Sequence, residues 1–515
     1  MQQEVLISPG RNGGAQVGQL VEVAITHWPT RRFQAQGNIV EVLGEYMAPG
    51  MEIEVALRNY DIPHEWPAEA LKEARRLKPE VDEKDKERRV DLRELPFVTI
   101  DGADARDFDD AVYCEPRTGS SGDIVAEGWR LYVAIADVSH YVKVDSALDA
   151  EARLRGNSVY FPERVIPMLP EELSNGLCSL NPNVDRLAMV CEIALARNGK
   201  MIGYQFYEAV INSHARLTYD VVSAMLEHPR SAEGKEAMAE YAAVVPHVKH
   251  LYAVYKALQK QRHNRGAIDF ETRETRIVFG EDRKISEILP TERNDAHKLI
   301  EECMLCANVA MAEFLEEHDL PGLYRVHDGP PEEKLEKLRG FLSSLGLTLN
   351  RGKGDPTPKD YLALLEVVRE RPDFQLIQTV MLRSLSQAMY SPDNHGHFGL
   401  NYEAYTHFTS PIRRYADLLN HRAVRSIIRS RKNTERVQRV GARSMPKARI
   451  YPYELQQLEE IGVEVSLTER RADEATRDVV TWLKCEFMLG RVGESFPGVI
   501  TAVTGFGLFV ELIDI

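Results

Sequence analysis

Five carboxylates crowd into the ten residues Asp101-Gly102-Ala103-Asp104-Ala105-Arg106-Asp107-Phe108-Asp109-Asp110. The residues on either side, Leu95 to Ile100 and Ala111 to Tyr113, are apolar and have the pattern of buried strands. Carboxylates held this close repel one another strongly unless cations lie between them. Because a cluster between two buried strands is not a solvated run of charge, the stretch predicts a cation site.

Strand geometry suggests which of these carboxylates meet. Side chains alternate along an extended segment, so Asp107 and Asp109 share one face while Asp110 points elsewhere. Asp101 can reach the same place from across the turn at Gly102. Hard oxygen ligands of this kind suit Mg²⁺, with Mn²⁺ as a substitute. An EF-hand loop is the rival, but its ligand spacing and its glycine are missing. For any single aspartate, a polar turn with capping side chains is the simpler alternative.

Composition limits the class of protein. The 515 residues, 28% charged and 43% hydrophobic, are typical of a globular protein with several domains. No apolar run approaches the roughly 18 residues of a membrane span, and the first residues lack a signal pattern. We therefore expect a cytoplasmic protein with no membrane partner. The six cysteines are scattered, and we interpret Cys303 and Cys306 as core thiols rather than zinc ligands.

The net charge of −15 argues only superficially against a nucleic-acid partner. Acidic and basic residues are segregated along the chain, which makes net charge a weak guide. Residues 422–449 carry ten Lys or Arg side chains and one acidic residue, Glu435. This run is either a nucleic-acid contact or a solvated basic face.

The N-terminal part has the pattern of a small β-barrel. Residues 1–66 contain short β-like runs with glycine between them, and Gly50 to Leu57 is expected to begin a further strand. Arg31, Arg32 and Phe33 would lie on a loop beside the barrel, a combination suited to gripping single strands. Residues 67–94 are charged and helical in pattern, and we expect a linker there.

The remainder divides into three parts. Residues 95–430 show strands first and helical periodicity later, which predicts an α+β domain rather than a doubly wound sheet; residues 116–128 would form an exposed insertion. Residues 431–490 would be a basic segment and a helical extension of that domain. Residues 491–515 contain two β-runs around Gly505 and Phe506, which we expect to begin an incomplete OB-fold barrel. The expected fold is thus an α+β domain flanked by small barrels.

A second dense stretch runs from Tyr402 to Arg422. Ser410-Pro411 is expected to begin a helix, with proline in its first turn. Backbone N–H groups there, with Arg413 and Arg414, would form a phosphate site, because an arginine can donate to two phosphate oxygens at once. The alternative is an ordinary capped helix with surface ion pairs.

Three further side chains are candidates for substrate contact. Glu301 lies on an amphipathic helix, where a metal or ribose contact competes with plain helix surface. Tyr160 and Phe270 lie beside proline or glycine and could stack on bases, although core packing is the commoner role. No P-loop or nucleophile-elbow motif occurs in the sequence, so no ATP requirement is expected.

Several of these motifs, in order along nearly the whole chain, resemble the ribonuclease II/ribonuclease R family. They are Thr99 to Asp110, Val165 to Pro170 with Leu173-Ser174, and His407 to Tyr415. Asn181-Pro182 and Glu469 to Ala475 are similar to the bacterial ribonuclease R branch of that family.

The resemblance implies an RNB-type α+β catalytic domain flanked by cold-shock-like and OB-fold barrels. It implies a processive 3′→5′ exoribonuclease of RNA decay and quality control, which hydrolyses RNA to nucleoside 5′-monophosphates with Mg²⁺. The expected partner is single-stranded RNA with a free 3′ end, or structured RNA with a 3′ overhang, and the protein is expected to be a monomer. Against the family pattern, the first barrel is incomplete and most of the last is missing, so we expect a chain truncated at both ends.

The resemblance also assigns residues. It implies a metal site made by Asp101, Asp107, Asp109 and Asp110, with Asp109 the most critical. It implies that Arg413 stabilises the scissile phosphate, that Glu301 lies near the 3′-terminal nucleotide, and that Tyr160 and Phe270 clamp the terminal bases; Arg414, Arg31, Arg32 and Phe33 are further RNA-binding candidates. A Mg²⁺ phosphoesterase acting on DNA or nucleotides and an inactive RNA-binding scaffold remain as alternatives.

We predict that Arg413→Lys is almost as harmful as Arg413→Ala. The point charge of a lysine cannot replace the bidentate hydrogen bonding of an arginine to a phosphate. Loss of one preorganised donor lowers the rate of catalysis by about 10²–10³. Initial rates of RNA hydrolysis for the two variants and the unsubstituted protein test this. A lysine variant with nearly full activity would mean that positive charge alone suffices.

Overall fold

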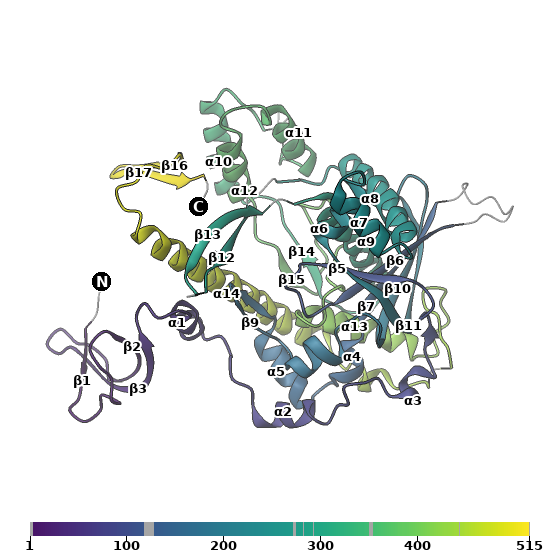
Figure 1. Cartoon of the computed structure of the whole chain (residues 1–515), viewed down its shortest axis with the longest axis horizontal. Coiled ribbons are helices and arrows are strands. Elements are labelled where there is room, and N and C mark those ends of the chain that lie inside the picture. The colour runs from purple at the N-terminus through teal and green to yellow at the C-terminus, as the bar shows by residue number, and fades with distance from the viewer. Residues whose placement is uncertain are drawn as a thin grey trace.

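The structure is a computed structural model of the chain, and it describes residues 4–117, 128–270, 274–281, 283–291, 293–349, 354–441, 443–513 and 515. Most of the insertion expected at residues 116–128 therefore lies outside the described residues. Figure 1 shows a large central body, a small N-terminal sheet at one side, and a C-terminal hairpin at the end of a long helix.

A six-stranded sheet forms the centre of the body, in the order β10-β7-β6-β5-β11-β4. Its strands are β4 (Val90–Asp91), β5 (Phe97–Asp101), β6 (Asp110–Pro116), β7 (Trp129–Ala136), β10 (Asp185–Leu195) and β11 (Met201–Thr218). The long strand β11 pairs antiparallel with β10 in its first part and parallel with β5 in its last. Since β10 also pairs with β7, the pairing of β10 with β11 closes a circuit of five strands.

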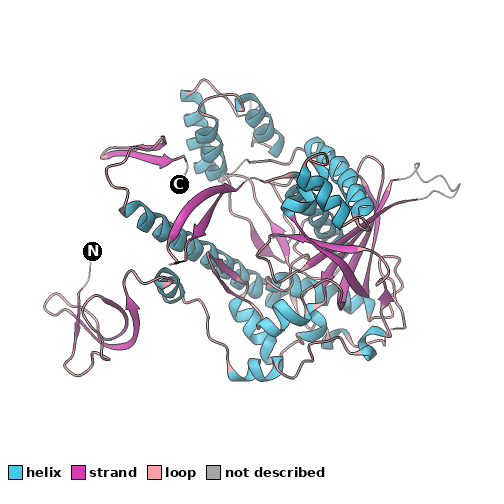
Figure 2. Ribbon diagram, viewed as in Figure 1, coloured by secondary structure: helices cyan, strands magenta, loops and turns pink. Residues whose placement is uncertain are grey.

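Helices cover the sheet and complete the predicted α+β arrangement (Figure 2). α8 (Val245–Arg265) packs on β6, α9 (Asp295–Glu317) on β7 and β10, and α13 (Tyr415–Ile428) on β11. The ring of Phe206 lies 5.2 Å from those of Phe314 and Phe408, so three segments distant in sequence meet at one point of the core. Cys303 and Cys306 are buried in α9, as the sequence predicts.

Shorter elements surround this core. Between the sheet strands and before α8 lie α4 (Val138–Tyr141), α5 (Ala147–Arg155), β8 (Val159–Phe161), β9 (Arg164–Ile166), a π-helix (Glu172–Leu177), α6 (Tyr219–Leu226) and α7 (Ala232–Glu240). Later come β12 (Glu274–Phe279), β13 (Ile285–Thr291), β14 (Tyr324–Val326), β15 (Met389–Ser391) and a 3-10 turn (Lys447–Arg449). α2 (Ala68–Ala74) and α3 (Glu83–Lys86) occupy the expected linker.

Three helices form a smaller body with its own apolar core. They are α10 (Glu332–Ser344), α11 (Pro358–Val368) and α12 (Phe374–Ser384). They lie in the later part of residues 95–430, where the sequence shows helical periodicity. Phe270 packs against this second core.

Every residue of α13 is buried, although six of its side chains are polar or charged. Arg425 donates to Glu208 at 2.5 Å and also pairs with Asp137, while Arg422 donates to Asp149 at 2.7 Å. Buried charges persist only when they are paired in this way. The first arginines of the basic run therefore belong to the core, and the interpretation of the whole run as a nucleic-acid contact is wrong for them.

The N-terminal sheet contains β1 (Val5–Ile7), β2 (Gln19–His27) and β3 (Ala35–Glu45), in the order β1-β3-β2. The strand expected from Gly50 is instead a helix, α1 (Met51–Asn59). Its alternating sequence suits a strand, but Ile53, Ala56 and Leu57 pack on a long helix, and that packing decides its form.

That long helix is α14 (Leu455–Leu489), which crosses the body and carries the hairpin of β16 (Gly498–Thr504) and β17 (Gly507–Leu512) beyond its end (Figure 1). The hairpin confirms the two β-runs predicted there. Phe506 and Phe509 are exposed on it, with ring centroids 6.0 Å apart.

We predict that removing residues 491–515 leaves the melting temperature of the body unchanged. An isolated hairpin is marginally stable in water, and this one lies away from the described core.

By contrast, Phe314→Ala should lower the free energy of unfolding by about 3–5 kcal/mol, because it opens a cavity where three aromatic rings meet. Thermal and urea unfolding of both proteins provide the test. A drop on removal of the hairpin would show that it shelters apolar surface on the body.

Candidate active site

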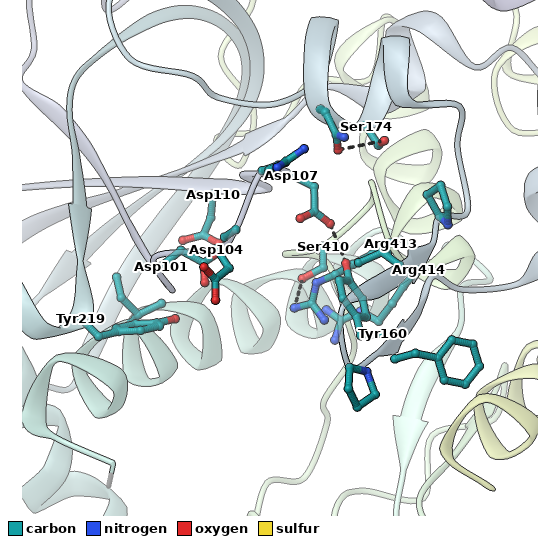
Figure 3. Close-up of a pocket in the computed structure, with 18 of the residues that line it drawn as sticks. Asp101, Asp104, Asp107, Asp110, Tyr160, Ser174, Tyr219, Ser410, Arg413 and Arg414 are labelled. Atoms are coloured by element: carbon teal, nitrogen blue, oxygen red, sulfur yellow. Dashed lines mark hydrogen bonds between the residues drawn. The ribbon is translucent and has the colours of Figure 1, made fainter. Parts of the chain in front are cut away.

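A cavity of ≈ 1520 Å³ opens beside the aspartate cluster (Figure 3). Asp101, Asp104, Asp107 and Asp110 line it together with Tyr160, Glu301 and Arg413. Asp109 lies beneath this surface and is almost fully buried. The sequence-predicted site is thus brought to one place from segments more than three hundred residues apart.

The sheet places the aspartates. Asp101 is the last residue of β5 and Asp110 the first of β6, and these neighbouring strands hold the loop between them. Inside the loop, the Ser179 hydroxyl donates to the carbonyl of Arg106 at 2.9 Å and accepts from the N–H of Phe108 at 3.0 Å. These two hydrogen bonds of Ser179 fix the backbone immediately before Asp109.

A second loop, residues 404–414, faces the aspartates. The N–H of Ile412 donates to Asp109 Oδ1 at 2.8 Å, and the N–H of Ser410 donates to Asp417 Oδ1 at 2.8 Å. Because these carboxylates hold the backbone as a turn, α13 begins at Tyr415 and not at Ser410-Pro411, so the predicted helix start is wrong. The N–H of Phe408 donates to Asn308 Oδ1, which ties the same loop to α9.

The two arginines of this loop have different surroundings. Arg413 Nε lies 3.4 Å from Asp109 Oδ2, its Nη2 donates to Ser410 Oγ at 2.9 Å, and 44% of its side chain is exposed. Donors of Arg413 therefore remain free to bind an anion. Arg414 donates twice to Asp417, at 2.9 and 2.8 Å, and is tied to its own helix. The geometry makes Arg413 the stronger candidate for phosphate contact.

Burial, reinforced by repulsion between neighbouring carboxylates, dominates the electrostatics of the site. Burial raises the pKa of Asp110 to about 7, with the negative charge of Asp101 adding to the effect. Burial also raises the pKa of Asp101, and it raises that of Asp109 well above the usual value despite the nearby Arg413. Carboxyls with raised pKa values in one pocket are typical of functional sites that lack their counter-charge.

The donor set fits a hard divalent cation. Asp109 Oδ2 is buried and accepts no hydrogen bond from the described residues, so a lone pair is available there. Asp101 and Asp110 lie close together in the lining of the cavity (Figure 3), and carboxylate oxygens are the ligands that Mg²⁺ or Mn²⁺ prefers. Among the described residues, no three acidic, histidine or cysteine side chains already converge on one point. Asp107 is turned aside, because its Oδ2 accepts from the Tyr160 hydroxyl at 2.6 Å.

The other predicted residues fall into two groups. Tyr160 and Glu301 line the cavity, and Glu301 accepts from Arg262 at 3.0 Å and from Arg293. Phe270 packs on the smaller helical body instead. Arg31, Arg32 and Phe33 lie exposed in the N-terminal part, between β2 and β3.

Two contributors to the site were missed. Tyr219 lines the cavity next to the aspartates, and its ring stacks on His297 with centroids 3.9 Å apart. Its position directly after Thr218, which caps α6, is a signal for a helix start but not for a site. The hairpin β12–β13 supplies another wall through Thr275 to Phe279, and nothing in its sequence distinguishes it from an ordinary hairpin.

Comparison with known proteins agrees with this geometry. The RNB domain matches residues 89–430, and the cold shock domain matches residues 1–67. The chain belongs to the RNB family. The predicted resemblance and the predicted fold class, an RNB-type α+β domain with a cold-shock-like domain, are therefore confirmed.

Individual relatives align with nearly the whole chain, beyond the RNB domain itself. It is 53% identical to ribonuclease R of Vibrio cholerae over 515 residues, which cover 99% of this chain and 60% of that protein. It is 51% identical to ribonuclease R of Escherichia coli, with the same two coverages. The chain thus spans about 60% of the length of these curated relatives.

Solved structures show the same architecture. RNase R of Mycoplasma genitalium, solved in complex with ribose-methylated single-stranded RNA, aligns with a TM-score of 0.87 at 29% identity, over 99% of this chain and 76% of that one. Yeast Ssd1, described as a pseudonuclease, aligns with a TM-score of 0.68 at 18% identity over 93% of this chain and 56% of that one. This last likeness shows the RNB fold alone, so activity must be argued from the site. Among the described residues, no helix is long and apolar enough to cross a bilayer.

The raised pKa of Asp110 predicts a pH-dependent stability in the metal-free protein. The folded carboxyl titrates near 7 instead of its ordinary 3.8. As the pH rises through this window, the unfolded chain ionises freely and the folded chain does so only at a cost, so the free energy of unfolding falls. Asp110→Asn removes the contribution of this carboxyl, so between pH 5 and pH 8 its free energy of unfolding should fall by on the order of 2 kcal/mol less than that of the unsubstituted protein.

Urea unfolding in a chelator at the two pH values measures the difference. Asp104→Asn is the matched control, because Asp104 lies in the same loop but is exposed. Parallel pH profiles for the unsubstituted protein and Asp110→Asn would show that Asp110 titrates as it does in water.

Proposed function

We propose that this RNB-family chain is a metal-dependent 3′→5′ exoribonuclease that processively hydrolyses RNA to nucleoside 5′-monophosphates. The observation that carries the proposal is the buried Oδ2 of Asp109, which accepts no hydrogen bond from the described residues and lies 3.4 Å from Arg413 Nε. A dead relative of this fold has no need to keep such a carboxylate under strain. The identity of 53% to a ribonuclease R supports the same activity.

Asp101, Asp109 and Asp110 would hold the metal, with Asp107 joining when Tyr160 releases it. Mg²⁺, or Mn²⁺ in its place, supplies a Lewis acid for the phosphate and lowers the pKa of a bound water. The carboxylates themselves provide negative charge that repels phosphate, so metal and RNA binding should be coupled.

The chain's own residues position the substrate. Arg413 has free donors above Asp109 and would grip the scissile phosphate, stabilising charge that develops there in the transition state. Ser410 and Asp109 hold that guanidinium in place, which keeps the grip preorganised. The hydrolysis breaks the bond from phosphorus to the preceding 3′ oxygen, which leaves the phosphate on the released nucleotide.

The remaining lining residues suit a single strand that enters by its end. Tyr160 presents a ring whose hydroxyl is anchored on Asp107, so it would stack on a terminal base. Glu301 is oriented by two arginines and has carboxylate oxygens to accept ribose hydroxyls. Phe270, Arg414 and the N-terminal residues Arg31, Arg32 and Phe33 remain proposed RNA contacts along the path of the strand.

The proposed partner is RNA with a free 3′ end, including structured RNA with a single-stranded overhang. The Mycoplasma genitalium relative has been solved with double-stranded RNA as well, which supports the second kind of substrate. We propose a monomer that acts in the cytoplasm, and the six free thiols fit a reducing compartment.

Asp109→Asn provides the decisive test. The amide keeps the shape but removes charge that the metal needs, so the variant should lose about a thousandfold or more in rate while RNA binding stays nearly intact. The assay follows a 5′-labelled RNA and its DNA equivalent with Mg²⁺ and analyses the products.

We expect the labelled RNA to be converted to a short labelled end product with release of monophosphates, and we expect no products from DNA or from RNA with the variant. Near-normal cleavage by Asp109→Asn would remove Asp109 from the mechanism. Degradation of the DNA would favour a general phosphodiesterase instead.

A further inference from the structure

A second cavity of ≈ 960 Å³ adjoins the catalytic one. The two share Tyr160, Arg413, Arg414 and Val480 as lining residues, so these side chains form a partition between them. In Figure 3, Tyr160, Arg413 and Arg414 lie together on one side of the site, opposite Asp101, Asp110 and Tyr219. The second cavity therefore begins at the guanidinium that is proposed to hold the scissile phosphate.

The proposed chemistry creates a need for a second opening, and in this respect the inference rests on the proposed function. Each hydrolysis leaves a nucleoside 5′-monophosphate whose phosphate lies against Arg413. In a processive enzyme the shortened RNA stays bound and fills the way by which the strand entered. The product must therefore leave by another route before the next phosphate can reach Arg413.

The lining of the second cavity suits a small polar ligand. One wall is a face of α14, where Glu469, Asp473, Thr476 and Val480 recur at helical spacing. Glu469 is neutralised by Arg325 at 2.7 Å. Asp473 and Arg477 of this wall are both exposed, so Arg477 presents a solvent-accessible cation to the phosphate of a passing nucleotide.

The opposite wall is the segment Gly156 to Tyr160, which includes the start of β8. The Asn157 side-chain amide donates to the carbonyl of Ser158 at 2.9 Å, while its Oδ1 is buried and accepts nothing from the described residues. Arg414, the other basic group of the wall, is engaged by Asp417 and would not retain the product phosphate.

We propose that this second cavity is the exit for the nucleoside 5′-monophosphate product. The nucleotide moves from Arg413 past Asn157 and Thr476 and leaves between Asp473 and Arg477. Product release through such a path is a separate step that can limit turnover without changing the chemical step.

Thr476→Trp tests the exit, because the indole would fill the passage at a position that takes no part in metal or phosphate binding. Thr481→Trp, on the exposed side of the same helix, is the matched control. Rapid quench with RNA labelled at its 3′-terminal nucleotide measures formation of the first monophosphate. Uniformly labelled RNA measures the later cleavages of each bound strand.

We expect Thr476→Trp to form the first monophosphate at the rate of the unsubstituted protein and to slow the following cleavages by about tenfold or more. Thr481→Trp should leave both phases unchanged. If the tryptophan variant does not fold, as judged by its thermal unfolding, Thr476→Met should give a smaller slowing of the same kind.

Two results would overturn the exit. Unchanged rates in both phases would show that the product leaves elsewhere. A parallel loss of first cleavage and RNA affinity would show that RNA itself occupies the cavity. Failure of the proposed function is a distinct result, because the unsubstituted protein would then form no first monophosphate.

Discussion

The withdrawal of several carboxylates from water is the constraint on which the rest of this structure depends. Asp101, Asp109 and Asp110 are drawn together by the ends of two paired strands, and burial raises the pKa of each. Within the described chain, the N–H of Ile412 and the guanidinium of Arg413 offset part of this cost. A bound cation would offset the rest of this unfavourable free energy, so metal binding would stabilise the folded protein.

The loop of residues 404–414, which carries Ile412 and Arg413, is held in place by α13. Asp417 accepts from the N–H of Ser410, and the Asn420 amide donates to the carbonyl of His407 at 2.9 Å. α13 is fixed in turn by Arg425, whose partners Asp137 and Glu208 lie on the sheet side of the helix. A buried ionic anchor thus positions, through one helix, the backbone that meets the aspartates.

The sequence predicted those parts of the molecule where one local pattern dominates. The aspartate cluster, the helical periodicity in the later part of residues 95–430, and the two β-runs of the final hairpin could all be predicted. Tertiary contacts decided the rest: α1 is helical because it packs on α14, and Ser410 lies in a turn because Asp417 takes its N–H. Tyr219 could not be foreseen as a lining residue, since only the course of β11 carries it beside Asp101.

The course of β11 also has a consequence for synthesis of the protein. Its last residues pair with β5 more than one hundred positions earlier, and Arg413 arrives from almost two hundred positions later still. Pairings this distant form slowly and late. A nascent chain emerging from the ribosome therefore holds its aspartates without the arginine until nearly the whole domain has been made, and the proposed hydrolysis of RNA would have to wait for the finished fold.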